Sequence, residues 1–260
     1  MSRPPPSKGS FDLFLCKLLS HSGLSPADRA ALLALPRAHR RFEPGAFLLR
    51  EGDRPDICPI LLSGFAFRRK LSQDGDRQIV AIKIPGDSLD FQSIFVSTAD
   101  HDLQALTEIE VAVIANRDME NLVASRPGIA RAVITDILIE ASVGREWLLN
   151  NGRRSARARL AHLLCELHLR LELTGSPGLV ARSLPLTQEQ LADLLGLTPV
   201  HINRTLKTLV ERGAVVRSGR KIRIADLEKL KAIAGFNPRY LHREVDAACG
   251  GETSPFAGAD

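Results

Sequence analysis

The sequence predicts an α+β fold in three parts: an N-terminal β-roll of the jelly-roll type, a long helix, and a C-terminal winged helix-turn-helix domain. Three observations support this prediction. Short apolar and β-branched runs, separated by turn signals such as Pro44-Gly45 and Asp74-Gly75, occupy residues 40–116. Apolar or small residues then recur in alternating steps of four and three along residues 126–151. Finally, two capped helical segments flank Gly196 and are followed by a hairpin.

The N-terminal part is expected to combine short helices with the roll. Ser25-Pro26 supplies a helix N-cap and a favourable first helical residue. Within the roll, residues 65–71 and 77–84 flank a turn sequence and predict a hairpin. The expected boundaries are a disordered N-terminus at 1–10, the β-roll domain at 11–125, the long helix at 126–151, the helix-turn-helix domain at 152–233, and a disordered tail at 234–260.

The long helix has a seam of the kind found in coiled coils, and we predict that it holds a homodimer together. The residues assigned to this contact share small or apolar side chains at heptad-like spacing. They are Ala130, Ile134, Ile137, Ala141 and Leu148. The alternative, an amphipathic helix that lies on its own β-roll, remains open.

The charge distribution is uneven. Residues 152–233 contain 15 lysines and arginines against 7 acidic residues, whereas the rest of the chain has 20 against 23. A basic C-terminal domain on a slightly acidic body is typical of a nucleic-acid-binding module attached to a sensor or scaffold. The chain has no apolar run of transmembrane length and no secretion signal at its start, so we expect a cytoplasmic protein without a membrane partner.

Neither an enzyme nor a metal protein is predicted, so no catalytic or metal-binding residue is assigned. The four cysteines lie far apart, which argues against a disulfide framework and against a zinc or iron–sulfur site. His162, Cys165 and His168 spread too widely around one helix for a compact metal site and are interpreted as core or surface residues. No nucleophile motif or glycine-rich phosphate loop accompanies the histidines and acids of the β-roll.

The helix-turn-helix is the most specific signal in the sequence. Thr187 with Gln190 three residues later forms a capping box for the first helix, and Gly196 allows the sharp turn that ends it. Thr198-Pro199 then opens a second helix whose apolar side must face inward. The hairpin at residues 214–224 completes a wing with basic residues at its tip. We predict that the second helix enters the major groove of double-stranded DNA.

The predicted DNA contacts fall into two groups. Base edges are assigned to Val200, Asn203 and Arg204, because valine suits a thymine methyl, asparagine can pair with adenine or neighbouring bases, and arginine can donate a bidentate pair to guanine. Contacts with the DNA backbone are assigned to polar and basic residues around these three, because such contacts position the protein without reading sequence. These are Thr187, Gln188, Thr198, His201, Lys207, Arg217, Arg220 and Lys221.

The order and spacing of several motifs resemble the Crp/Fnr family of bacterial transcription regulators over about residues 11–233. The motifs are Arg50-Glu51-Gly52-Asp53, Leu62-Ser63-Gly64, Asp74-Gly75 and Pro85-Gly86-Asp87 in the roll, and Arg157-Ala158-Arg159-Leu160-Ala161, Leu186-Thr187-Gln188 and residues 194–209 in the C-terminal domain. The resemblance implies a cyclic-nucleotide-binding-like β-roll, a dimerisation helix and a winged helix-turn-helix. It also implies a homodimer that binds a palindromic promoter site and contacts RNA polymerase.

The sequence departs from the family at its ligand and base-reading positions. Cyclic-nucleotide-binding relatives carry Gly-Glu and Arg-Ser/Thr-Ala, where this chain has Asp90-Phe91 and Ala99-Asp100-His101-Asp102. We therefore expect neither cyclic AMP nor, with Cys16 alone near the N-terminus, an iron–sulfur cluster. An unidentified effector is assigned to a pocket at Asp87, Asp90, Phe91, Asp100 and His101.

In the recognition helix, the family's Arg-Glu-x-x-(Ser/Gly)-Arg becomes Pro199-Val200-His201-Ile202-Asn203-Arg204. Only the last arginine persists, so we expect a different target sequence. A second function class also remains: a metal- or ligand-binding β-roll protein or scaffold without sequence-specific DNA binding. The two classes differ in whether DNA affinity falls steeply with salt.

Overall fold

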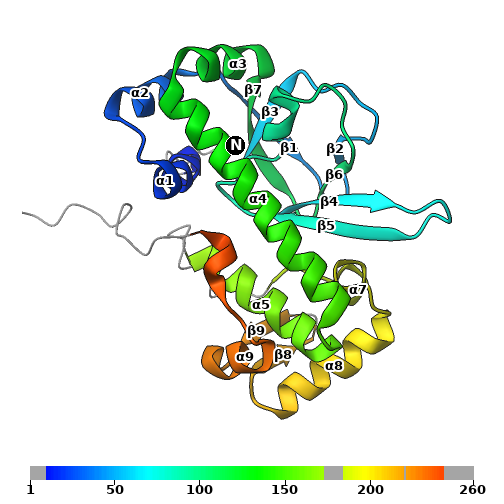
Figure 1. Cartoon of the computed structure of the whole chain (residues 1–260). Helices are drawn as coiled ribbons and strands as arrows, with labels where there is room; N and C mark the ends of the chain where they lie inside the picture. Colours follow the sequence, from blue (N-terminus) through cyan, green and yellow to red (C-terminus); the bar gives the residue numbers. More distant parts are fainter. Residues whose placement is uncertain (1–9, 173–183, 220, 243–260) are drawn as a thin grey trace, which may run out of the picture.

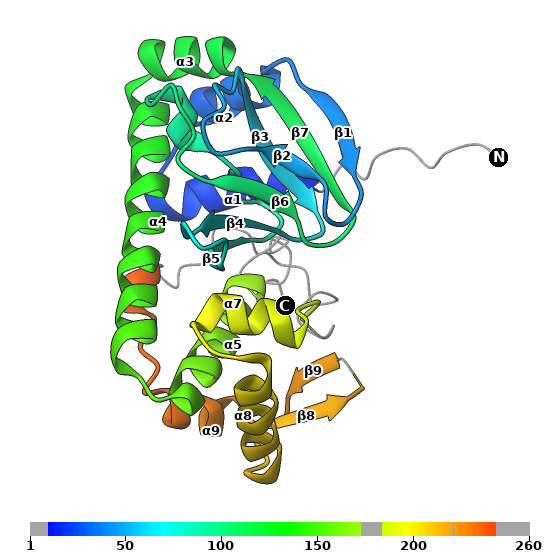
Figure 2. The ribbon, with the colours of Figure 1, turned by 90° about the vertical axis from the view of Figure 1, so that its right-hand side faces the viewer.

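The computed structural model describes residues 10–172, 184–219 and 221–242. In Figure 2 the β-roll lies above the C-terminal domain, and one long helix runs down the side of both. The chain begins with α1 (Ser10–Ser22) and α2 (Pro26–Ala34), and the Ser25 hydroxyl accepts a hydrogen bond from the Asp28 backbone N–H, as predicted. Helix α1 already includes Ser10, which corrects the expected disordered stretch at its last residue; residues 1–9 lie outside the described part.

The β-roll consists of two antiparallel sheets with strand orders β1-β7-β3 and β2-β6-β4-β5. Sequence-distant strands therefore lie side by side, as a jelly roll requires, and the predicted hairpin is β4–β5. Gly64 connects β3 to β4 at φ +79°, where a Cβ atom would lie 2.2 Å from the Glu108 carbonyl oxygen. The strands are β1 Ala38–Phe42, β2 Phe47–Leu49, β3 Ile57–Ser63, β4 Ala66–Leu71, β5 Arg77–Lys83, β6 Asp102–Ala105 and β7 Ile109–Ala115, with a 3-10 helix, η1 (Phe91–Ile94), between β5 and β6.

Two helices follow the roll. Helix α3 (Asn116–Ser125) leads into α4 (Pro127–Arg153), the long helix that runs diagonally across the front of the molecule in Figure 1. One face of α4 buries Ile129, Ala132 and Val133 against α1 and the roll. The helix is thus attached to its own β-roll along one side, while its opposite side carries exposed apolar residues.

The C-terminal domain contains the predicted winged helix-turn-helix. Helix α5 (Ala156–Glu172) packs against the two helices of the motif and against α9, and the short wing closes the domain. The apolar run at residues 179–184 also predicts a short strand, most of which lies outside the described residues. The further elements are α7 Gln188–Leu195, α8 Pro199–Glu211, β8 Val215–Ser218, β9 Lys221–Ile224 and α9 Leu227–Ala234.

The predicted disordered tail is wrong for its first nine residues, 234–242. Ala234 ends α9, and a 3-10 helix, η2 (Pro238–Leu241), packs against α4. The Tyr240 hydroxyl donates a 2.8 Å hydrogen bond to the buried Glu166 carboxylate, and Leu241 is buried. These side chains anchor the segment. The sequence prediction missed them because the residues further along the chain are rich in alanine and glycine, as in a disordered tail. Residues 243–260 lie outside the described part.

No helix within the described ranges is long and apolar enough to span a membrane.

Candidate DNA-binding surface and sensor cleft

Local sequence chemistry sets the geometry of the helix-turn-helix, and the capping predictions are confirmed. The Thr187 hydroxyl accepts from the Gln190 backbone N–H at 3.1 Å, and the Gln190 side-chain oxygen accepts from the Thr187 N–H at 2.9 Å. Gly196 ends α7 in the left-handed conformation at φ +60°. The Thr198 hydroxyl then accepts from the His201 N–H at 3.2 Å and starts α8. Turn and caps together position α8 against α7.

Helix α8 is strongly amphipathic. Its inner face is buried: Ile202, Thr205, Leu206 and Leu209. The three residues assigned to base edges are exposed in its first two turns, with Val200 reaching 80% exposure. Of the backbone-contact candidates, Thr187, Thr198, Lys207, Arg217 and Lys221 are exposed, Gln188 and His201 are half-buried, and Arg220 lies outside the described residues. The structure therefore places the described candidates on α7, α8 and the wing of one domain.

One contact within this surface was not predicted from the sequence. The wing residue Arg217 donates from Nη1 to Asn203 Oδ1 at 2.8 Å, and Gln188 Nε2 lies 3.4 Å from the same oxygen. Arg217 also donates from Nε to the Gly219 carbonyl at 3.0 Å. Arg217 was assigned to a phosphate, yet here it binds the side chain of a base-reading candidate. No sequence signal marks this pairing, because it depends on how the wing folds back toward α8.

The outward face of α4 differs from the predicted seam at one position. Ile134, Leu138 and Leu148 are 47%, 61% and 76% exposed, and Ala141 is exposed between them. Ile137, which was assigned to the dimer contact, instead packs against the core beneath α1. Both Ile137 and its neighbour Leu138 are apolar, so the sequence pattern could not show which of them the roll covers.

Ala130, the remaining residue of the predicted seam, is half-buried near the start of α4. The exposed positions Ile134, Leu138, Ala141 and Leu148 are separated by steps of four, three and seven residues, with Arg145 at the position that would divide the last step. The outward face of α4 therefore keeps a heptad-like apolar stripe, in a slightly different phase from the predicted one.

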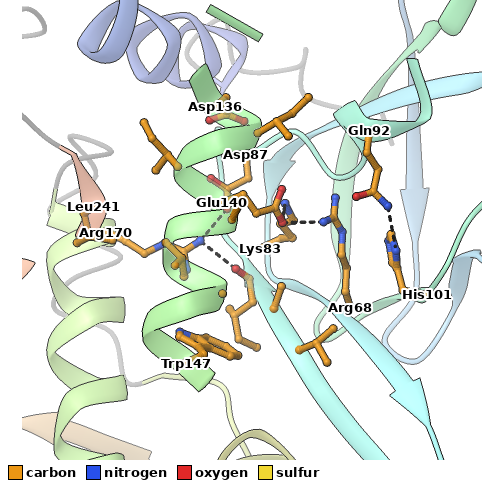
Figure 3. Close-up of a pocket in the computed structure, with 18 of the residues that line it drawn as sticks. Arg68, Lys83, Asp87, Gln92, His101, Asp136, Glu140, Trp147, Arg170 and Leu241 are labelled. Atoms are coloured by element: carbon orange, nitrogen blue, oxygen red, sulfur yellow. Dashed lines mark hydrogen bonds and ion pairs between the residues drawn. The ribbon is translucent and has the colours of Figure 1, made fainter. Parts of the chain in front are cut away.

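A cleft of about 450 Å³ lies where the β4–β5 face of the roll meets α4, α5 and Leu241 (Figure 3). Two buried cations, Arg68 and Lys83, both donate to Glu140 Oε1 at 2.7 Å. Burial alone would raise the pKa of Glu140, but Lys83 and Arg68 lower it to about 2. The cleft thus contains a carboxylate from the long helix held between two cations of the roll.

A chain of alternating charges connects this cleft to the C-terminal domain. Lys17 contacts Asp136 at 2.7 Å and Asp87 at 3.0 Å, and Arg170 of α5 contacts Asp87 at 3.0 Å and Glu166 at 3.2 Å. Burial would raise the pKa of Asp87, but Lys17 and Arg170 hold it well below its usual range. The ion pairs therefore join α1, the roll, α4 and α5.

The fully buried Glu166 is the last carboxylate of this chain. Its two oxygens accept hydrogen bonds from Trp147 Nε1 at 3.2 and 3.0 Å, in addition to the Tyr240 hydroxyl. Trp147 belongs to α4 and also lines the cleft. The carboxylate thus ties the long helix, α5 and the C-terminal 3-10 helix together.

The predicted effector residues do not form one site. Asp87, Asp100 and His101 line the cleft. Asp90 is buried beside a separate apolar cavity of about 110 Å³ between the two sheets, and Phe91 packs against Phe14 with ring centroids 5.9 Å apart. Neither of these last two residues lines the cleft, although Asp90 Oδ1 lies 3.6 Å from Nη2 of Arg68, which does line it.

The carboxylates of Asp100 and Asp102 both have hydrogen-bonding partners. Asp102 pairs with Arg69 at 3.0 Å, and Asp100 pairs with His101 at 2.8 Å. Sequence reasoning missed Arg68 and Lys83, because they lie on neighbouring strands rather than in a family motif. The cleft therefore holds buried cations as well as acids.

The roll also contacts the helix-turn-helix directly. Arg77 of β5 donates from Nε to Asp193 Oδ2 of α7 at 2.7 Å, and Gln78 Nε2 donates to the carbonyl oxygens of Asp193 and Leu194. These bonds hold the first helix of the motif against the β4–β5 hairpin. Their donors belong to the sensor and their acceptors to the DNA-binding domain.

The histidines and cysteines that were weighed as metal ligands do not converge. His162 and Cys165 are buried in the core of the C-terminal domain, and His168 pairs with Glu172 at 3.0 Å. Across the described residues, no group of three or more histidine, cysteine or acidic side chains is arranged to hold a metal ion.

Comparison with known proteins agrees with this architecture. Residues 39–126 match the cyclic nucleotide-binding domain and residues 158–233 match the Crp-like helix-turn-helix domain. The chain is 28% identical to the transcriptional activator protein FnrL of Cereibacter sphaeroides, over 80% of this chain and 85% of that protein. It is 29% identical to the nitrogen fixation regulation protein FixK of Rhizobium meliloti, over 76% and 88%. Among solved structures, FixK2 from Bradyrhizobium japonicum aligns with a TM-score of 0.69 at 23% identity, covering 76% of this chain and 98% of that one.

A sensor-type β-roll joined by a long helix to a basic winged helix-turn-helix defines a DNA-binding transcription regulator. The matching domains stand in the same order as the motifs recognised in the sequence. The chain belongs to the Crp/Fnr family of bacterial transcription regulators.

Proposed function

We propose that the protein acts as a homodimer on a two-fold-symmetric promoter site, with α8 of each protomer in the major groove. The observation that supports this most strongly is the apolar stripe on α4, because Ile134, Leu138 and Leu148 face away from their own protomer. Large apolar side chains in a row on one face of a helix are typical of a partner-binding surface. A two-fold dimer places two recognition helices on one face of the duplex, so the site has two related halves.

The exposure of side chains on α8 and the wing supports the DNA-contact roles that we propose for them. Arg204 is exposed, and within the described chain its guanidinium has no hydrogen-bond or ion-pair partner, so it is free to donate to a guanine. Val200 and Asn203 flank it and complete the base-reading group. Lys207 and the wing residue Lys221 add positive charge for phosphates. Since relatives such as FnrL are named activators, we expect this protein to contact RNA polymerase at its promoters in the cytoplasm.

The cleft between the roll and α4 is the proposed effector site. It has the volume of a small-molecule pocket, and its walls come from the sensor, the long helix and α5. A ligand that prefers one arrangement of these parts would shift their equilibrium. Cyclic AMP is a poor candidate, because Phe91 is buried against Phe14 instead of offering a ribose-binding carboxylate, and because Arg68 and Lys83 already donate to the Glu140 carboxylate.

We also propose that the protein works without an iron–sulfur cluster. Two of its cysteines, Cys58 and Cys165, are buried in different cores, one in the roll and one in the C-terminal domain. Cluster binding needs several thiolates around one site. The separation of these two cysteines supports the proposal that the protein holds no cluster.

The proposal is tested with the purified full-length protein. We expect sedimentation to give the mass of a dimer, and DNA affinity to fall steeply with salt on random sequence but less so on a selected site. A DNA-independent scaffold predicts no such binding, and a monomer that binds single half-sites contradicts the dimer.

A further inference from the structure

The Asn203 side chain is held from two sides before any DNA is bound. Arg217 Nη1 lies 2.8 Å and Gln188 Nε2 lies 3.4 Å from its Oδ1 atom. The two neighbours come from different elements, the wing strand β8 and the first turn of α7. Asn203 itself is exposed on α8, in the turn that presents side chains to base edges.

The chemistry of Arg217 determines which way this amide points. A guanidinium has only N–H donors, so the Asn203 atom beside it must be the carbonyl oxygen and not the NH₂ group. Arg217 is in turn oriented by its Nε–H bond to the Gly219 carbonyl at the wing tip, at 3.0 Å. The carbonyl oxygen of Asn203 is therefore occupied, and the NH₂ group remains as its free hydrogen-bonding function.

An asparagine with both groups free pairs with adenine by accepting from N6 and donating to N7. An asparagine whose oxygen is occupied can only donate. In the major groove guanine offers two acceptors, O6 and N7, and thymine offers O4, whereas adenine offers the single acceptor N7 with its N6 amino group beside it. A donor that faces N6 meets another donor, and a donor that binds N7 leaves N6 without the acceptor that a free asparagine would supply, so either arrangement with adenine costs affinity.

We propose that Arg217 and Gln188 are positioning residues that turn Asn203 into a hydrogen-bond donor, so that it selects guanine or thymine over adenine. This inference rests on the proposed binding of DNA through α8. It also revises the expected pairing of Asn203 with adenine and gives the wing residue Arg217 a part in base selection instead of a simple phosphate contact. Among the described residues no hydrogen bond joins the Arg204 guanidinium to Arg217 or Gln188, so we expect Arg204 to read its own base independently.

The experiment selects binding sites from randomised DNA with the full-length protein and with three variants. Asn203→Ala identifies the base pair that this residue contacts, since preference is lost there. At that base pair we expect the wild type to favour guanine or thymine over adenine by about tenfold, the discrimination typical of a good base contact. Arg217→Met keeps the side-chain length and removes the donor, so adenine should become accepted at this position alone.

Arg223→Met is the matched control. Arg223 lies on the other wing strand opposite Val216, is exposed, and loses the same charge without touching Asn203. It should lower overall affinity and leave every base preference unchanged. The inference is overturned if Arg217→Met and Arg223→Met give the same site preferences, or if the wild type favours adenine at the Asn203 position. A protein that selects no DNA sequence at all would overturn the proposed function together with the inference.

Discussion

The double variant Ile134→Asp, Leu138→Asp should separate the protein into monomers. Fully burying a leucine or isoleucine contributes about 1.5–3 kcal/mol. The two side chains are 47% and 61% exposed in the protomer, so roughly half of that contribution is still to be gained in a dimer. Each side chain then contributes about 1 kcal/mol. The four side chains of a dimer together contribute about 4 kcal/mol, or roughly a thousandfold in the dissociation constant, before any cost of placing carboxylates in the interface.

Sedimentation velocity over a concentration series measures this loss, and binding to paired against single half-sites shows its consequence for DNA recognition. Leu71→Asp is the control, because Leu71 is 49% exposed at the end of β4, away from α4. The control should remain dimeric. A double variant that stays dimeric at the same concentrations as the wild type would refute the assignment of the interface to α4.

Four further results are expected. Arg204→Ala should weaken specific binding by about 1–3 kcal/mol and relax one base pair in each half-site, whereas equal losses on specific and random DNA would reduce it to a phosphate contact. Arg77→Ala should speed amide hydrogen exchange in α7 by removing the pair with Asp193, and unchanged protection would show that this contact stabilises nothing. Calorimetry should detect no cyclic AMP binding near or below about 10 µM, and saturable binding of about 7 kcal/mol would contradict this. The free energy of unfolding should fall as pH drops in two steps. Burial lowers the pKa of His162 to about 4, so below about pH 6.5 the unfolded chain binds a proton that the folded chain does not. Below about pH 4.5 the same holds for Glu140, whose pKa in the folded chain is about 2, and urea titrations showing a flat profile between neutral pH and about pH 5 would contradict the His162 step.

Features that depend on neighbouring residues along the chain were predictable. The capping box of Thr187 and Gln190, the left-handed Gly196 and the Ser25 cap each follow from a few consecutive residues, and the structure contains all of them. The jelly roll was likewise predicted from turn signals at regular spacing. Local backbone chemistry and hydrophobic periodicity suffice for such features, because each is decided within a few residues.

Features that depend on packing between distant segments were not predictable. The phase of the α4 stripe depends on which of Ile137 and Leu138 the roll covers. The cleft cations Arg68 of β4 and Lys83 of β5 bind Glu140 of α4, which lies 72 and 57 residues further along the chain, respectively. Tyr240 anchors a segment that the sequence predicted to be disordered. The prediction failed because the hydrogen-bond partner of Tyr240, Glu166, is 74 residues away. A single sequence contains no local trace of these pairings.

The most direct test of the central claim is the selection of binding sites from random DNA by the full-length protein, combined with footprinting on the selected sequences. The account predicts enrichment of a two-fold-symmetric motif with half-sites about one helical turn apart, protected on one face of the duplex. An asymmetric motif, or binding without sequence enrichment that merely falls with salt, would contradict it.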